Sequence, residues 1–440
     1  MDNAVIPSLL KMPNPGDYVR VKTKKDELEG ILIQSHEKEI IFLKLKSGYN
    51  IGINKKDVKK ITSIKKAKIT SKKNSIKQNI KLPKISILHT GGTIASKVDY
   101  KTGGVISSFT PEDIVSMFPE LSRIANIDSE LVANMWSEDL RFEHFKLIAK
   151  AIEKKVKNGT QGIIIGIGTD NLAVASAALS FIIEQTPVPI IFVGSQRSSD
   201  RGSSDAAMNL ICAAEFITKT NFTGVAICMH EHSDDKTCAI LPACKTKKLH
   251  SSRRDAFKVV NDSIIARINY NTKEIEFIKN DYKKKDKKTK LIIKPAMEEK
   301  TGLLKIHTNM FSEQFKCYKD YKGLVIEGTG IAGNIPIGEI DKLTKEHTKI
   351  KKELKKLIDS GTIIVTTSNC LFGRINTNVY SRGREQTELG IISGQDMLAE
   401  TAFVKLAWLL ANHKKEAKEL ISKNLRGEIN LKHSYKKQII

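Results

Sequence analysis

The segment that decides the fold runs from residue 162 to 171 and has the sequence Gly-Ile-Ile-Ile-Gly-Ile-Gly-Thr-Asp-Asn. Its first seven residues carry no polar side chain, which is typical of a strand buried inside a sheet. Thr169 and Asp170 follow in a short turn, and residues 172–181 favour a helix. A buried strand that leads through a turn into a helix is the building unit of a parallel α/β sheet.

The same unit recurs on both sides of this segment. Further strands are predicted at 85–88, 189–193 and 224–229, and amphipathic helices at 141–158, 172–185 and 205–219. A second α/β block follows a Lys-rich stretch near 280–290, with predicted strands at 324–327 and 362–366 and a helix at 340–358. A last helix begins near Asp396. The alternation predicts mostly parallel sheets with helices on both faces.

The first part of the chain has a different pattern. Residues 16–62 contain short β-prone runs at 19–21, 30–33, 40–45 and 49–53, separated by charged or glycine-containing turns. This pattern predicts a small all-β barrel. We therefore divide the chain into a β-barrel domain (1–64), a Lys-rich linker (65–84), a larger α/β domain that carries the active site (85–290) and a smaller C-terminal α/β domain (291–440).

The net charge of +24, from 73 basic and 49 acidic residues, has two interpretations. It favours an anionic partner such as RNA. It is also explained by free use of Lys on solvated surfaces, because the Lys clusters fall in predicted loops and few aromatic residues lie between them. The ordinary interpretation is favoured for any single cluster, and an RNA-associated role stays open for the whole.

Cysteine usage and the N-terminal residues indicate the compartment. The six cysteines form no Cys-x-x-Cys pair, which favours a reducing environment over a disulfide scaffold or zinc ribbon. No apolar run approaches the roughly 20 residues of a membrane span. Met1-Asp2-Asn3 is not a basic region followed by an apolar core, so no secretion signal is expected. We expect a cytoplasmic protein without a membrane or metal site.

A first candidate site follows the strand at 85–88, where the chain continues His-Thr-Gly-Gly-Thr to Thr93. Gly91 and Gly92 allow a sharp bend, and ligands of open α/β sheets bind at the C-terminal ends of strands. Thr93 would present its hydroxyl in that crevice, although a Gly-Gly pair is more often only a tight turn. Tyr100 lies in a polar, glycine-bearing loop that is either a lid over the site or an ordinary surface loop.

The second candidate site is the pair Thr169 and Asp170. Helix capping alone would explain one of these residues. The functional interpretation places both opposite Thr93, because a threonine hydroxyl needs a base before it can act as a nucleophile. A second hydroxyl with a carboxylate and a lysine would form a proton-transfer group. Several lysines between residues 245 and 255 are candidates, and spacing alone does not choose among them.

Together these residues resemble a known family. Thr90-Gly-Gly-Thr93-Ile-Ala-Ser and Gly168-Thr-Asp170 resemble the two signatures of the bacterial-type L-asparaginase/glutaminase family, and 193–197 (Val-Gly-Ser-Gln-Arg) matches its next strand end. The resemblance covers roughly residues 85–440 and implies an asparaginase-like fold of two α/β domains. It also implies the roles of the site residues: nucleophile Thr93, proton-transfer residues Thr169, Asp170 and Lys248, lid Tyr100, and substrate-binding Ser137 and Glu138.

The N-terminal barrel and the segments 198–210, 249–257, 373–380 and 394–403 are similar to the family of D subunits of archaeal glutamyl-tRNA(Gln) amidotransferases. This resemblance implies that the chain hydrolyses glutamine and passes ammonia to an E-type subunit. That partner would use ATP and Mg²⁺ to convert Glu-tRNA(Gln) to Gln-tRNA(Gln), while this chain needs no cofactor. It further implies a homodimer within a heterotetramer.

Two positions depart from the asparaginase pattern. The family usually has His before Gly-Thr-Asp and a hydroxyl residue after it, whereas this chain has Ile167 and Asn171. These changes remove an imidazole at 167 and a hydroxyl at 171 that could tune the site, and they put catalytic efficiency in question. Two alternatives therefore stay beside the main hypothesis: a free L-asparaginase with an added N-terminal domain, and a catalytically weak RNA-associated scaffold. Preference for Gln or Asn is not determined, because one methylene changes binding only slightly.

Overall fold

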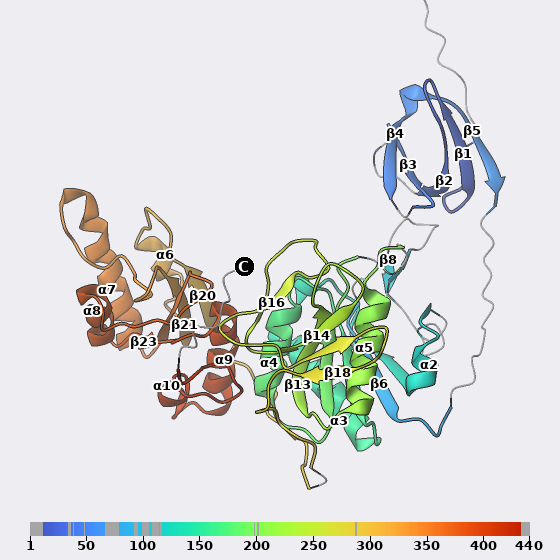
Figure 1. Ribbon diagram of the computed structural model, residues 1–440. Coiled ribbons are helices and arrows are strands. Elements are labelled where there is room, and N and C mark those ends of the chain that lie inside the picture. Colours follow the sequence, from blue (N-terminus) through green and yellow to red (C-terminus); the bar gives the residue numbers. More distant parts are fainter. Residues whose placement is uncertain are drawn as a thin grey trace, which may run out of the picture.

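The computed structural model describes residues 12–33, 37, 39–47, 49–66, 79–91, 96–98, 105–107, 114, 117–197, 199, 202–286 and 288–432. The chain forms a small β unit, a large central α/β unit and a C-terminal α/β unit (Figure 1). The predicted pair of α/β units with parallel strands, preceded by an all-β unit, is present. Residues 67–78 of the predicted linker lie outside the described residues.

The small β unit is an antiparallel sheet with the strand order β4-β3-β2-β1-β5. Alternate side chains, such as Val19 and Val21 of β1, are fully buried and form one apolar cluster with Leu43 of β3. Among the described residues, no backbone pairing joins the two outer strands, β4 and β5. The strands are β1 (Tyr18–Thr23), β2 (Glu27–Ile33), β3 (Ile40–Lys44), β4 (Asn50–Asn54) and β5 (Val58–Lys65), with a 3-10 turn at Lys55–Asp57.

The central unit contains an eight-stranded sheet with the order β18-β17-β14-β13-β12-β10-β6-β9. Five strands are parallel: β6 (Lys84–His89), β9 (Asn126–Leu131), β10 (Gly162–Gly166), β12 (Pro189–Val193) and β13 (Gly224–His230). Three antiparallel strands extend one edge: β14 (Thr237–Pro242), β17 (Ala266–Asn269) and β18 (Ile275–Phe277). The predicted parallel strands are therefore present, and the antiparallel extension was not predicted.

Helices cover both faces of this sheet because neighbouring residues of a strand point to opposite sides. Ile163 and Ile165 share one core with the helices α3 (Phe142–Lys157) and α4 (Leu172–Ile182). Ile164 points to the other core, which includes α2 (Leu121–Ile124) and α5 (Ala206–Lys219). The helix predicted at 172–185 ends at Ile182, because residues Ile183–Gln185 form β11 and pair with β19 (Ile292–Ile293).

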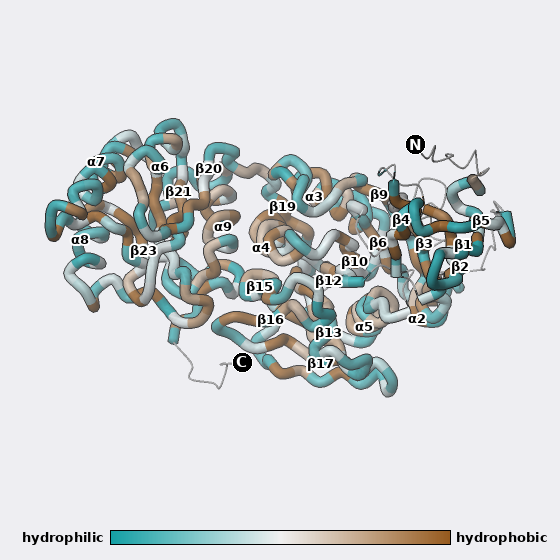
Figure 2. The backbone as a smooth tube through the Cα atoms, turned by 90° about the horizontal axis from the view of Figure 1, so that it is seen from above, coloured by the Kyte–Doolittle hydropathy of each residue, from teal (hydrophilic) through white to brown (hydrophobic). Residues whose placement is uncertain are grey.

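Short elements complete the central unit near the ends of these strands. Two hairpins consist of β7 (Ser96–Val98) with β8 (Val105–Ser107) and of β15 (Thr246–Lys248) with β16 (Phe257–Val259). A 3-10 turn spans Ser137–Asp139. The β15–β16 hairpin follows β14 and lies outside the eight-stranded sheet. It extends toward the C-terminal unit (Figure 2).

The C-terminal unit has a parallel sheet with the order β20-β21-β22-β23. One face carries α7, whose Ile350 and Leu354 are fully buried, and the other face carries α9. Helix α9 also packs against α4, so it joins the two α/β units (Figure 2). The elements are β20 (Thr301–Lys305), α6 (Glu313–Lys316), β21 (Gly323–Gly328), a 3-10 turn (Lys342–Thr344), α7 (Lys345–Asp359), β22 (Ile363–Ser368), α8 (Ser381–Leu389), β23 (Ile392–Ser393), α9 (Ala399–Asn412) and α10 (Ala417–Leu420).

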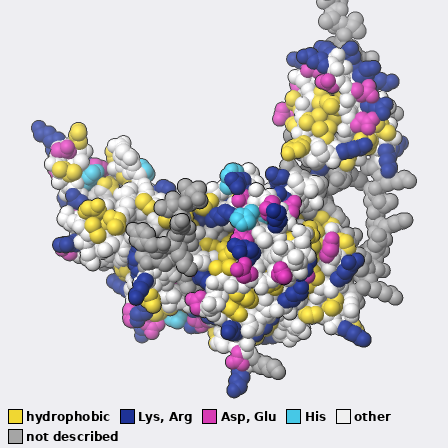
Figure 3. Space-filling view, viewed as in Figure 1, with side chains coloured by type: hydrophobic (Ala, Val, Ile, Leu, Met, Phe, Trp, Pro, Cys, Tyr) yellow, Lys and Arg dark blue, Asp and Glu magenta, His cyan; other side chains and the backbone are white. Residues whose placement is uncertain are grey.

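The surface is charged on every unit. On the face shown in Figure 3, Lys and Arg side chains lie on all three units and alternate with Asp and Glu. Within the part of the chain that the structure describes, no helix is both long and apolar enough to cross a membrane.

Candidate functional site

The candidate site lies at the C-terminal edge of the parallel strands, where β6 and β10 end side by side. Thr90 N–H donates to Gly166 O at 3.1 Å, and Met135 N–H donates to Thr90 O at 3.0 Å. Gly91 has a φ of +95°. A Cβ there would lie 2.8 Å from Met135 O, so only glycine fits this turn. The chain therefore turns sharply into the segment that carries Thr93.

Two predicted site residues lie outside the described residues. These are the predicted nucleophile Thr93 and the predicted lid residue Tyr100. The last described residue before Thr93 is Gly91, which is buried beside the end of β10. The other five predicted residues, Thr169, Asp170, Lys248, Ser137 and Glu138, are described.

The structure brings Lys248 together with Thr169 and Asp170. Lys248 Nζ donates to Thr169 Oγ1 at 2.9 Å and to Asp170 Oδ1 at 2.8 Å. The Lys248 side chain is 12% exposed, whereas that of Asp170 is 70% exposed. Lys248 reaches the turn from β15, where it is paired with Phe257, a residue of the core. Because an ammonium only donates, the hydroxyl proton of Thr169 stays available for another acceptor.

Ser137 and Asn171 connect a second loop to the same turn. The backbone N–H of Asn171 donates to Ser137 Oγ at 3.3 Å, and Asn171 Nδ2 donates to Ser137 O at 2.9 Å. Ser137 is buried, and a Cβ at Gly168 would lie 2.9 Å from its Cβ. Asn171, which departs from the family pattern, therefore orients Ser137. Glu138 is exposed beside it, and Ile167 is buried.

The loop after β12 supports Thr169 from behind. A Cβ at Gly194 would lie 2.8 Å from Thr169 Cγ2, so glycine allows this close approach. The loop is organised by Asp205, a fully buried carboxylate that accepts from Ser195 Oγ at 2.9 Å, Gln196 N at 3.1 Å and Arg197 N at 3.0 Å. Sequence reasoning missed Asp205. Its one signal was an acidic residue directly before a helix, which resembles an ordinary cap.

A cavity of about 330 Å³ adjoins Lys248 on the side of the C-terminal unit. It is lined by Lys247, Lys248, Leu249, Asn261, Lys305, Glu327, Ser368, Asn369, Cys370, Leu371, Gly373, Gln395, Met397, Leu398 and Ala399. A larger cavity of about 780 Å³ includes Thr223 and Gly224, at the start of β13, and none of the predicted site residues. The smaller cavity is therefore the relevant one for the chemistry of Lys248.

No described group of three or more His, Cys, Asp or Glu side chains has the arrangement of a metal site. The described side chains at this edge are the hydroxyls of Thr169 and Ser137, the carboxylates of Asp170 and Glu138, and the ammonium of Lys248. Side chains of these types are common general acids and bases in enzymes.

Comparison with known proteins covers nearly the whole chain. Residues 13–64 match the GatD N-terminal domain, 84–283 the N-terminal domain of asparaginase, and 300–420 the glutaminase/asparaginase C-terminal domain. The chain is 41% identical over 423 residues to the D subunit of the glutamyl-tRNA(Gln) amidotransferase of Methanococcus maripaludis strain C6, covering 94% of this chain and 98% of that protein. It is 40% identical to the corresponding D subunit of Pyrococcus furiosus, with 94% of each chain covered.

The chain belongs to the family of glutamyl-tRNA(Gln) amidotransferase D subunits. Among solved structures it is similar to the thermostable L-asparaginase from Thermococcus kodakarensis, with a TM-score of 0.68, 25% identity, and coverage of 79% of this chain and 99% of that one. L-asparaginase I from Vibrio cholerae shares the fold with a TM-score of 0.66, 23% identity, and coverage of 80% of this chain and 100% of that one. The chain thus combines an asparaginase-type amidohydrolase fold with an extra N-terminal unit.

Proposed function

We propose that this chain is the glutaminase subunit of a tRNA-dependent amidotransferase. It hydrolyses glutamine through Thr93 and supplies ammonia to an E-type subunit. The observation that carries the proposal is the contact of Lys248 Nζ with Thr169 and Asp170, in a chain of the D-subunit family. This group lies at the strand edge from which the chain leads to Thr93.

In the proposed reaction, the Thr93 hydroxyl attacks the amide carbon of glutamine while Tyr100 closes over it. Backbone N–H groups of the Gly91–Gly92 turn stabilise the oxyanion. The C–N bond breaks, and Thr169, Asp170 and Lys248 transfer the Thr93 proton to the departing ammonia. Water then hydrolyses the Thr93 ester and releases glutamate. Ser137 and Glu138 bind the polar groups of the amino acid.

The partner completes the overall reaction. The E-type subunit uses ATP and Mg²⁺ to convert Glu-tRNA(Gln) to Gln-tRNA(Gln) with the ammonia, and this chain itself uses no cofactor. The proposed complex is a cytoplasmic heterotetramer built on a homodimer of this chain. Within the chain, residues 85–290 form the glutaminase domain, residues 291–440 the smaller domain, and residues 1–64 the β domain after which the linker 65–84 begins.

The test of this function is Thr93→Ala in the complex with the partner subunit. Removal of the hydroxyl should abolish glutamine hydrolysis. The variant complex should still form Gln-tRNA(Gln) when ammonium is supplied, because the partner's chemistry does not use Thr93. Both products are measured against the wild-type complex. Near-normal glutamine hydrolysis by Thr93→Ala would show that Thr93 is not the nucleophile.

The similarity to the Thermococcus L-asparaginase favours a second candidate, a free L-asparaginase. It predicts steady amide hydrolysis by the purified chain, with no change when the partner subunit and tRNA are added. The amidotransferase predicts low hydrolysis alone and an increase with both, because uncoupled hydrolysis wastes glutamine. An RNA-associated scaffold predicts no hydrolysis under either condition. One assay with and without the partner and tRNA distinguishes the three.

A further inference from the structure

One short strand, β15, is attached to both α/β units. Lys248 contacts Thr169 and Asp170 of the central unit. Lys247 Nζ donates in the opposite direction to Glu400 Oε1 of the C-terminal unit at 2.6 Å, since successive side chains of a strand point to opposite sides. Lys245 lies two residues before Lys247 and points the same way. Its Nζ donates to Asp396 Oδ2 at 2.8 Å and to Asp396 O at 3.0 Å.

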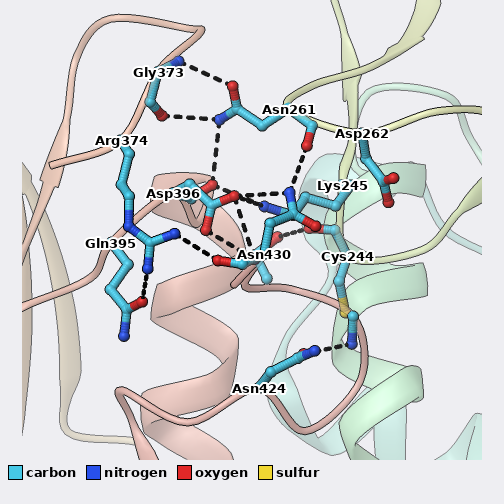
Figure 4. Close-up of polar contacts among 12 residues, drawn as sticks. Cys244, Lys245, Asn261, Asp262, Gly373, Arg374, Gln395, Asp396, Asn424 and Asn430 are labelled. Atoms are coloured by element: carbon cyan, nitrogen blue, oxygen red, sulfur yellow. Dashed lines mark hydrogen bonds and ion pairs between the residues drawn. The ribbon is translucent and has the colours of Figure 1, made fainter. Parts of the chain in front are cut away.

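Asp396 is itself fixed from several sides, as Figure 4 shows. Asn430 donates from its backbone N to Asp396 Oδ1 at 3.1 Å and from Nδ2 to Asp396 Oδ2 at 2.9 Å. Asn261, in the segment after β16, exchanges two hydrogen bonds with the backbone of Gly373 at 3.0 and 2.9 Å. The Lys245 and Asp396 side chains are 0% and 3% exposed. The residue directly before β15 is therefore attached to the C-terminal unit by a buried ion pair and hydrogen bonds.

Helix α9 contacts both sides of the Lys248 interaction: the segment that leads into β15, and the helix that follows Thr169 and Asp170. Thr401 Oγ1, in its first turn, donates to Cys244 O at 3.0 Å. The body of α9 packs against α4, and α4 begins at Leu172, directly after the turn that holds Thr169 and Asp170. The segment 396–401 and α9 thus contact both the strand that carries Lys248 and the helix that follows its partners.

We propose that segment 396–400 of the C-terminal unit sets the position of Lys248 Nζ against Thr169 and Asp170, with Lys245 and Lys247 as positioning residues. A lysine has a flexible four-carbon side chain, so its ammonium keeps one place only if its backbone and surroundings are fixed. Lys245 and Lys247 fix the backbone on the N-terminal side of Lys248. The consequence for catalysis rests on the proposed glutaminase function, whereas the positioning itself does not.

The test uses Lys247 and Glu400, because this pair is about one-third exposed and its loss should not unfold the protein. In the complex with the partner subunit, Lys247→Met and Glu400→Gln should each lower kcat for glutamine about 3- to 30-fold, the range of couplings transmitted through packed contacts. The KM should change less than kcat, because the proposed effect acts on proton transfer by Lys248 rather than on the binding of glutamine. The pH profile of kcat should shift. The charge exchange Lys247→Glu with Glu400→Lys should recover most of the loss.

Lys258→Met is the matched control. Lys258 is directly opposite Lys247 in the hairpin, but its Nζ donates to Glu231 O of the central unit at 2.7 Å. Removing Lys258 changes the same hairpin without loosening its attachment to the C-terminal unit. Its kcat and pH profile should therefore match the wild type. A loss in Lys258→Met equal to that in Lys247→Met would show only general damage to the hairpin.

A second measurement does not depend on activity. Acetylation of Lys248 by an amine-reactive reagent, followed by mass spectrometry of its peptide, reports how well its ammonium is held. The rate should rise several-fold in Lys247→Met and stay unchanged in Lys258→Met. An unchanged rate together with an unchanged kcat in Lys247→Met would overturn the positioning proposal. A wild-type complex without glutaminase activity would overturn the proposed function, while the labelling would still decide the positioning.

Discussion

Two lysines three residues apart have opposite surroundings. Lys245 and Asp396 meet at the junction of the two α/β units, where their side chains are 0% and 3% exposed. Lys248 and Asp170 meet at the candidate site with side chains 12% and 70% exposed. A buried charge must keep its partner, because its separation from water is costly. A pair open to solvent exchanges partners at little cost. We therefore expect the Lys245–Asp396 pair to stabilise the junction, and the Lys248–Asp170 pair to take part in proton transfer.

The largest effect should follow from Lys248→Met. If Lys248 belongs to the proton-transfer group, kcat for glutamine should fall about 10²- to 10⁴-fold, as for other groups that move protons. The free energy of unfolding should change by less than about 1 kcal/mol, because Asp170 is mostly exposed and such ion pairs stabilise little. Steady-state kinetics and urea denaturation measure both. A kcat within a few-fold of wild type would contradict the role of Lys248 in proton transfer.

The reverse result is expected for Lys245→Met. This change leaves the buried Asp396 carboxylate without its cation and should lower the free energy of unfolding by about 3–5 kcal/mol. Burial lowers the pKa of Lys245, and the adjacent Asp396 opposes that shift more strongly than the nearby Asp262 does, so the ammonium depends mainly on Asp396. Urea denaturation measures the loss, with Lys305→Met as the control at an exposed pair with Glu327. Equal stability of the two variants would contradict the junction's structural role.

The sequence predicted the parts of the fold in which side-chain pattern decides the structure. The strands β6, β10, β12 and β13 are short apolar runs, and all four are present. Strand β5 was not among the predicted runs because only Ile61 of its eight residues is buried and three are lysines. The antiparallel strands β14, β17 and β18 were also missed. They pair with neighbours in the sequence, β14 with β13 and β18 with β17, but β17 and β18 have only four and three residues, which is too short for a clear alternating pattern.

The site shows the same limit. Thr169 and Asp170 were identified from their place at a strand end, whereas Lys248 was selected only by family resemblance. Local spacing could not separate Lys245, Lys247 and Lys248, because their difference arises from partners more than 75 positions away in the chain, such as Asp170 and Asp396. The contact of Asn171 with Ser137 was hidden for the same reason.

The smallest expected effect is a difference in thiol reactivity between a cysteine at the junction and a cysteine beside the candidate site. Cys244 precedes Lys245, and burial raises the pKa of its thiol to about 12. Cys370 is exposed and lines the cavity beside Lys248. A thiol reagent at pH 8 should therefore label Cys370 and the exposed Cys317 in the native protein, while Cys244 and the buried Cys212, Cys228 and Cys238 react only after denaturation.

Mass spectrometry of each cysteine peptide measures this labelling, with the denatured chain as the control for complete reaction. Labelling of Cys244 as fast as that of Cys370 would mean that the junction opens readily and that the two regions do not differ as described. Slow labelling of Cys370 would mean that the cavity beside Lys248 is closed. Lys245→Met should speed the labelling of Cys244 and leave that of Cys370 unchanged, because only the junction loses its buried pair.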